Sequence, residues 1–195
     1  MANYDDAEHA EPCLLSGLLA GCAGGFIATW MMNAAQTAAV QVADHLETQQ
    51  AQTPEGAKAV AAGKGFGAGP LENAQEATVA TKRTATALSR GLFGHELTSN
   101  ERAVVAGVIP LAFGTFVGGI YGVLAEYIPM VSLGRGTVFG TAVWLGAEEL
   151  ALPGLKLSKP ATEASWSSHA TGWAGHLVYG IALDAARRAI RSFLR

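Results

Sequence analysis

Six ionisable side chains lie within or at the ends of apolar stretches of the sequence. They are Glu126, Glu148, Glu149, His169, His176 and Asp184. Ionisable groups are costly in a membrane, so they usually face protein or water and mark pathways or sites. Imidazole changes its charge near neutral pH and exchanges protons with carboxylates. The proton-handling or ligand site is therefore predicted to consist of Glu148, Glu149, His169 and His176.

The spacing of three of these residues places them along one side of a helix. His169, His176 and Asp184 are separated by seven and eight residues, which nearly complete two helical turns. Chain direction sets Glu148 and Glu149 level with His169 and leaves His176 near mid-membrane. The alternative for His176 is a structural hydrogen bond to Ser, Thr or a backbone carbonyl. No HExxH or similar spacing is present, so neither a metal nor a cofactor is predicted.

A second group of charges is predicted at the opposite, inner boundary. Chain direction places Glu126, Arg135, Asp184 and Arg188 there. The simplest interpretation is interfacial ion pairing that anchors helix ends, and a functional role is the alternative.

Composition indicates a protein that meets lipid. Charged residues make up 15% of the chain, against roughly 25% in soluble domains, and apolar types make up 50%. The net charge of -3 gives no basic surface for nucleic acid, so nucleic acid is not a predicted partner. The apolar composition makes the lipid bilayer the predicted partner. Cys13 and Cys22 show no zinc or disulfide pattern. Residues 19–22 resemble a lipoprotein cleavage box, but the preceding residues are acidic, so an uncleaved membrane helix is predicted.

Hydropathy predicts an all-α membrane bundle with four transmembrane helices. The predicted spans cover residues 14–32, 103–125, 133–152 and 166–187. Thr98 and Glu101 have capping-box spacing before the second span, and Pro110 is expected to kink or break it. A buried helix of a soluble protein is the alternative for the third, but Pro129 and Pro153 bracket a segment of membrane length.

The sequence divides into three parts at these spans. Residues 1–33 hold an acidic N-terminus and the first span, 34–101 form a polar, partly helical, external segment, and 102–195 form a three-helix membrane region. The external segment contains a glycine-rich break at residues 63–69. This break lacks the spacing of a Walker phosphate loop, so a hinge is predicted. The C-terminal arginines predict cytoplasmic termini by the positive-inside rule. They are Arg187, Arg188, Arg191 and Arg195.

Two spans carry glycine at every fourth residue. The sets are Gly17, Gly21 and Gly25 in the first span, and Gly114, Gly118 and Gly122 in the second. Small residues let helices approach closely in lipid, where such packing drives association. We expect these ridges to pack spans together within one subunit; the alternative is an interface of a homo-oligomer or with another membrane protein.

From about residue 91 onward the chain resembles a known family. The segments GLFGHELTSNE, AFGTFVGGIYGVLAEYIP, FGTAVWLGAEELALPGLKLSKPATE and GHLVYGIALDAARR are similar to the YagU-like family of small bacterial inner-membrane proteins of unknown function. The resemblance implies a multi-pass helical protein of the bacterial inner membrane with no assigned reaction. It also draws attention to Glu126, Glu148, His176 and Asp184.

Three function hypotheses follow. The first is a non-enzymatic membrane protein that conducts or exchanges protons or a small solute through the Glu148, His169 and His176 side of the fourth span. The second is a structural or assembly partner that acts through its glycine ridges. A membrane-embedded enzyme is the third.

Overall fold

The computed structural model describes residues 13–92 and 98–193, and these residues form helices and turns without a β-strand, as the all-α prediction requires. The α-helices are α1 (Leu14–Gln50), α2 (Pro54–Ala61), α3 (Ala68–Leu92), α4 (Ser99–Tyr127), α5 (Thr137–Trp144), α6 (Leu152–Gly154) and α7 (Trp166–Phe193). Two 3-10 helices are η1 (Pro129–Gly136) and η3 (Ala161–Glu163), and η2 (Leu145–Ala151) is a π-helix. The acidic N-terminus and Arg195 lie outside the described residues.

Within the described residues, two helices are long and apolar enough to cross a membrane. They are Leu14–Gln50, which is α1, and Val104–Tyr127, which is most of α4. Only 39% and 22% of their most apolar stretches are buried inside the protein. The core helix of a soluble protein would be mostly buried, so the exposed apolar surface of α1 and α4 is better suited to lipid. The first two predicted spans thus coincide with candidate spans.

The prediction of four transmembrane helices is wrong in its count. The third predicted span is interrupted at its start, because Leu133, Gly134 and Arg135 leave the helical conformation before α5 begins at Thr137. After the eight residues of α5 the chain changes from α-helix to a π-helix that carries Glu148 and Glu149. The fourth, α7, is long enough but too polar, since serines, histidines and glycines occupy its first half.

The glycine ridges of α1 and α4 lie against each other in an antiparallel pair. A Cβ atom added at Gly21 would lie 2.7 Å from the Cα of Gly122, and one added at Gly118 would lie 2.6 Å from the Cα of Gly25. Real Cβ atoms do not approach other heavy atoms so closely, so the two backbones touch only because these positions lack side chains. Gly17 faces Gly122, and Gly114 faces Gly25 and Thr29.

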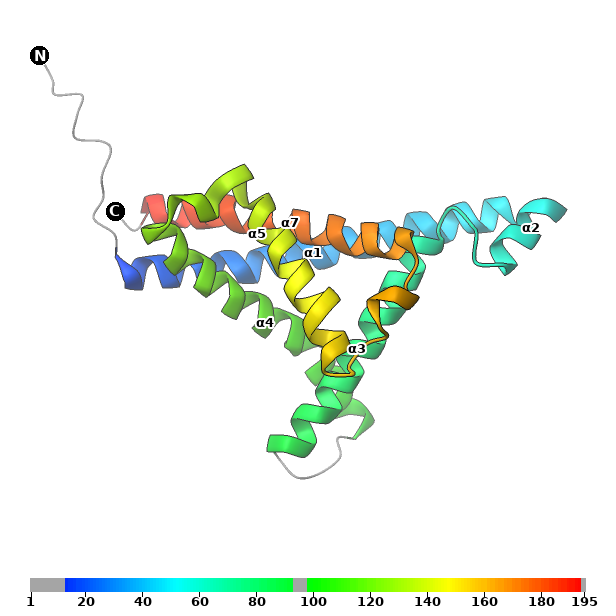
Figure 1. Cartoon of the computed structure of the whole chain (residues 1–195), viewed down its shortest axis with the longest axis horizontal. Helices are drawn as coiled ribbons and strands as arrows, with labels where there is room; N and C mark the ends of the chain where they lie inside the picture. Colours follow the sequence, from blue (N-terminus) through cyan, green and yellow to red (C-terminus); the bar gives the residue numbers. More distant parts are fainter. Residues whose placement is uncertain (1–12, 93–97, 194–195) are drawn as a thin grey trace, which may run out of the picture.

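Helix α7 completes a bundle with α1 and α4, and α5 packs on α7 (Figure 1). Gly24 of α1 approaches the backbone of Leu183. A Cβ atom added at Gly140 of α5 would lie 3.3 Å from the Cα of Gly180. The Tyr179 hydroxyl donates a hydrogen bond of 2.7 Å to the carbonyl of Gly114, which joins α7 to α4. The start of α1 and the end of α7 lie at the same end of the bundle (Figure 1).

The predicted polar segment is more ordered and more closely attached than its sequence suggested. α1 continues without a break past residue 33 to Gln50, and its far end projects beyond the bundle together with α2 (Figure 1). α3 then returns and packs against α7, α1 and α4. Thr98 and Glu101 form the predicted capping box at the start of α4, and α4 continues through Pro110 as one helix.

Candidate functional site

The π-helix η2 aims two consecutive glutamates at two different histidines of α7. Glu149 Oε1 lies 2.7 Å from His169 Nδ1, and Glu148 Oε1 lies 3.9 Å from His176 Nδ1. A π-turn widens the helix by one residue and is frequent at functional sites. The structure therefore brings together all four residues of the predicted Glu/His site, as two pairs one above the other.

The two hydrogen-bond neighbours of His169 favour its imidazolium form. Its Nδ1 faces the Glu149 carboxylate, and its Nε2 lies 2.9 Å from the carbonyl oxygen of Ala161. Both neighbours accept hydrogen bonds, so both ring nitrogens must donate. Burial opposes the charge, but these hydrogen bonds and the nearby carboxylates outweigh it and raise the pKa of His169 above its ordinary value.

His176 is bound differently, although it is almost fully buried. Its Nδ1 lies 3.0 Å from the carbonyl of Gly172, one turn earlier in α7, and therefore donates to that carbonyl. The 3.9 Å separation from Glu148 is too long for a hydrogen bond. The structural alternative for His176, a bond to a backbone carbonyl, is thus present, and the Glu148 carboxylate is left without a hydrogen bond from this imidazole.

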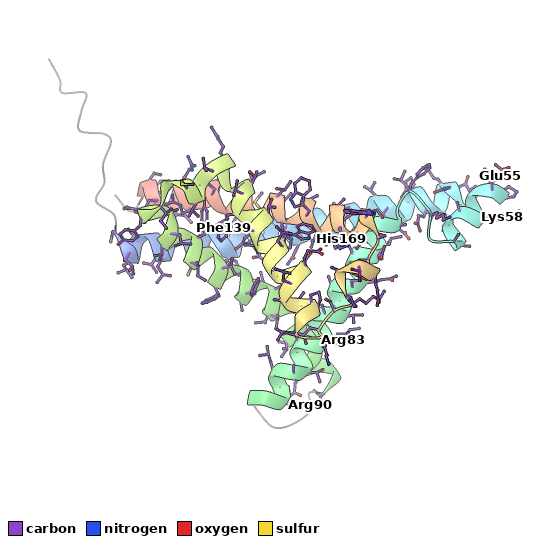
Figure 2. All side chains as sticks on the ribbon, in the orientation of Figure 1. Glu55, Lys58, Arg83, Arg90, Phe139 and His169 are labelled. Atoms are coloured by element: carbon purple, nitrogen blue, oxygen red, sulfur yellow. The ribbon has the colours of Figure 1, made fainter. Side chains whose placement is uncertain are left out.

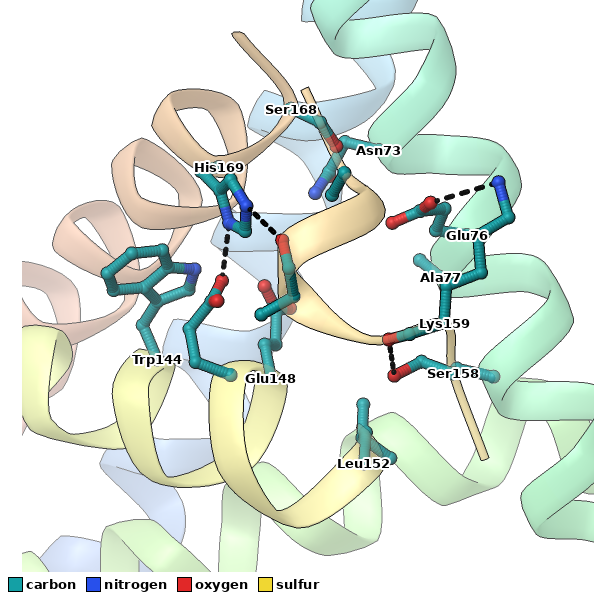
Figure 3. Close-up of a pocket in the computed structure, with 14 residues that line it drawn as sticks. Asn73, Glu76, Ala77, Trp144, Glu148, Leu152, Ser158, Lys159, Ser168 and His169 are labelled. Atoms are coloured by element: carbon teal, nitrogen blue, oxygen red, sulfur yellow. Dashed lines mark hydrogen bonds and ion pairs between the residues drawn. The ribbon is translucent and has the colours of Figure 1, made fainter. Parts of the chain in front are cut away.

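A polar pocket of about 60 Å³ surrounds the Glu149–His169 pair (Figure 3). Its other polar lining comes from elements that the sequence did not associate with the site: Asn73 and Glu76 of α3, Trp144 of α5 and Lys159 of the loop before α7. Lys159 Nζ lies 3.4 Å from Glu76 Oε1. The indole N–H of Trp144 is buried and has no hydrogen-bond partner in the described part of the chain.

Three polar side chains converge on Gly172 in the same region. A Cβ added there would lie 2.8 Å from Glu148 Oε2, 3.0 Å from Asn73 Nδ2 and 3.2 Å from Trp144 Nε1. The absence of a side chain at Gly172 therefore lets groups from α3, α5 and η2 meet. Gly172 lies in the polar first half of α7, and the sequence alone identified none of these three partners.

A larger chamber of about 560 Å³ adjoins the polar pocket, and Glu148 lines both. Its lining comes from α1, α3, α4, α7 and the continuous turn from α5 to α6, and most of it is apolar. Glu148 and His176 are part of this wall, together with Gln36 and Tyr179. Phe113 and Leu155 line the chamber and are both exposed, so the chamber is accessible from outside beside them. Only Glu148 borders both the polar pocket and the chamber among the four predicted residues.

The charges at the other end of the bundle form buried and half-buried ion pairs. Glu126 accepts hydrogen bonds of 3.1 Å from both Arg187 and Arg191. Asp184 lies 2.8 Å from Arg188 and accepts a hydrogen bond of 2.7 Å from the buried Tyr121 hydroxyl.

Two details of this end differ from the sequence analysis. Arg135 is exposed in the turn before α5 and has a positive φ of 54°. Arg191, one helical turn after Arg187, instead holds Glu126 with two nitrogens. The i, i+4 spacing of Arg187 and Arg191 was the signal that could have identified them as joint partners of one carboxylate.

Comparison with known proteins gives one match. Residues 93–185 match a family model described as a protein of unknown function, DUF1440. No match was found among curated proteins or among solved structures. The matched stretch covers α4 to most of α7, the region whose resemblance implied a family without an assigned reaction; that this is the YagU-like family stays a prediction.

Proposed function

We propose that the protein is a non-enzymatic integral membrane protein that exchanges protons or a small solute through the chamber bordered by Glu148 and His176. The observation that carries this proposal is the position of Glu148, which lines both a small pocket with many polar residues and a larger, mainly apolar chamber. A titratable group between a polar and an apolar space can bind a proton or a ligand from either.

The exposed surface of the bundle supports a membrane location. Phe116 of α4 and Trp30 of α1 each expose 65% of their area, although both lie within candidate spans. α1 also packs along α4 and α7 through its glycines. The proposed location is the bacterial inner membrane, with a multi-pass chain and both termini in the cytoplasm, because the arginine-rich end of α7 lies beside the start of α1 (Figure 1).

The chamber has the size and lining of a ligand site. Small-molecule sites enclose roughly 300–1,000 Å³, with mainly apolar walls and few polar groups. This chamber lies in that range and has Glu148, His176 and Gln36 among its few polar groups.

The experiment is a flux assay in proteoliposomes with an internal pH dye. Wild type should dissipate a pH gradient faster than empty liposomes, and Glu148→Gln and His176→Ala should reduce the excess rate. Glu163→Gln is the matched control, since Glu163 is an exposed glutamate of η3. The proposal fails if all four proteins show only the background rate for protons and for a panel of small solutes.

The alternative function, an assembly partner, needs a surface other than the glycine ridges, because α1 and α4 use these ridges for each other. The projecting end of α1 with α2, where Figure 2 labels Glu55 and Lys58, is the surface that favours it. Val42 in the second half of α1 and Phe66 between α2 and α3 are exposed apolar residues. A second copy of this chain, in a homo-oligomer, or another membrane protein would bind this surface. Crosslinking in native membranes that recovers only monomer would count against this alternative.

A further inference from the structure

We infer that the chamber binds an organic cation, a molecule with an ammonium-type head and an apolar body, whose head lies at Glu148. This inference rests on the proposed solute exchange and names the class of solute.

The formal charge of the chamber wall is negative. Glu148 is the carboxylate of that wall, and none of the described residues that line the chamber is Lys or Arg. Lys159 lines the adjoining polar pocket, but its Nζ lies 3.4 Å from Glu76 Oε1. An ionised carboxylate in an apolar chamber is stabilised by a positive partner, because a lone charge is expensive there.

His176 does not supply that partner by hydrogen bonding. Its Nδ1–H donates to Gly172, and the Glu148 oxygen is 3.9 Å away. The side chain of Glu148 retains 31% of its exposure, so an incoming ligand can reach the carboxylate.

The rest of the wall fits the apolar body of the ligand and provides aromatic rings for its cationic head. Phe113 and Tyr179 contribute aromatic rings, which attract cations through their π faces. Met32, Val117 and Leu152 provide aliphatic surface. Phe113 and Leu155, exposed at the rim, give an amphiphilic molecule a route from the apolar surface of the protein.

The test compares three probes of similar shape with the full chain purified in detergent. Benzyltrimethylammonium carries the charge, neopentylbenzene is its neutral carbon isostere, and phenylmethanesulfonate is an anion. Equilibrium dialysis against detergent alone, at the same micelle concentration, corrects for partitioning. We expect the cation to bind at least about tenfold more tightly than the other two.

Two variants separate charge from space. Glu148→Gln should remove the preference for the cation, and Ala147→Phe, which fills the chamber beside the carboxylate, should weaken both the cation and the isostere. Glu163→Gln should bind like wild type. Far-ultraviolet circular dichroism and gel filtration establish that each variant is folded.

Each outcome decides the inference. Equal binding of the cation and the isostere, preference for the anion, or no binding of any probe by folded wild type overturns it. Cation binding that survives both chamber variants overturns it as well. Selective cation binding without any flux in liposomes would leave this inference standing and remove the proposed exchange function.

Discussion

Adding one methyl group to the α1–α4 contact should destabilise the bundle, whereas the same change on an open helix face should not. The test pair is Gly21→Ala in the contact and Gly107→Ala in α4, where an added Cβ would meet nothing within 4 Å. Both changes replace glycine inside a helix, so both gain up to about 1 kcal/mol in helix propensity.

The difference comes from the contact itself. A Cβ at Gly21 would lie 2.7 Å from the Cα of Gly122, so the helices must separate by about 1 Å to reach ordinary carbon contact. The obstructing atoms are backbone, which cannot swing aside as a side chain can. Overpacking of this kind costs about 1–3 kcal/mol, so Gly21→Ala should lose up to about 2 kcal/mol net.

The measurement is the free energy of unfolding in mixed micelles titrated with sodium dodecyl sulfate, followed by tryptophan fluorescence. A second change, Gly118→Ala, adds a methyl to the same contact from the other helix, 2.6 Å from the Cα of Gly25. One separation of the helices relieves both clashes, so the double variant should cost less than the sum of the single ones. The reasoning is refuted if Gly21→Ala stabilises the protein as much as Gly107→Ala does.

Two further predictions concern charges. Glu126→Gln should destabilise the protein by about 3–5 kcal/mol in the same titration, because it removes the charge of the carboxylate that accepts hydrogen bonds from two largely buried arginines; exposed Glu163→Gln is the control, and a loss no larger than that of the control contradicts the prediction. The pKa of His169 is raised in the folded protein, so its charge contributes stability below its ordinary pKa of 6.5, and this contribution is lost as pH rises through the raised value. Glu149→Gln should therefore lower the melting temperature more below about pH 6 than near pH 9, and equal losses would show that His169 is not stabilised as an imidazolium.

The local parts of the fold were accessible from the sequence because their causes are local. A long run of uncharged residues predicts the helices of α1 and α4, and the Thr98 and Glu101 spacing predicts the cap, since both signals operate within a few turns. The third span failed for an equally local reason that hydropathy ignores. Gly134 and Gly136 adopt positive φ angles of 63° and 87°, which turn the chain just where the apolar run begins.

The partners in the candidate site were not accessible, because they depend on α3. That helix contributes Asn73 and Glu76, and its apolar face is too narrow for the sequence alone to predict packing in the bundle. Its attachment is polar: Glu72 accepts a hydrogen bond of 3.2 Å from the backbone of Ser165, just before α7. Such bonds follow no period along the chain.

That attachment also bears on how the chamber works. α3 lines the chamber through Ala77, Ala80 and Thr81 and is joined to the loop before α7 by Glu72 and by the Glu76–Lys159 pair. Half-exposed ion pairs contribute little stability, so α3 is held less firmly than α4, whose glycine contact with α1 is continuous. If solute exchange requires the chamber to open, α3 and the π-helix are the elements that can move while α1, α4 and α7 stay packed.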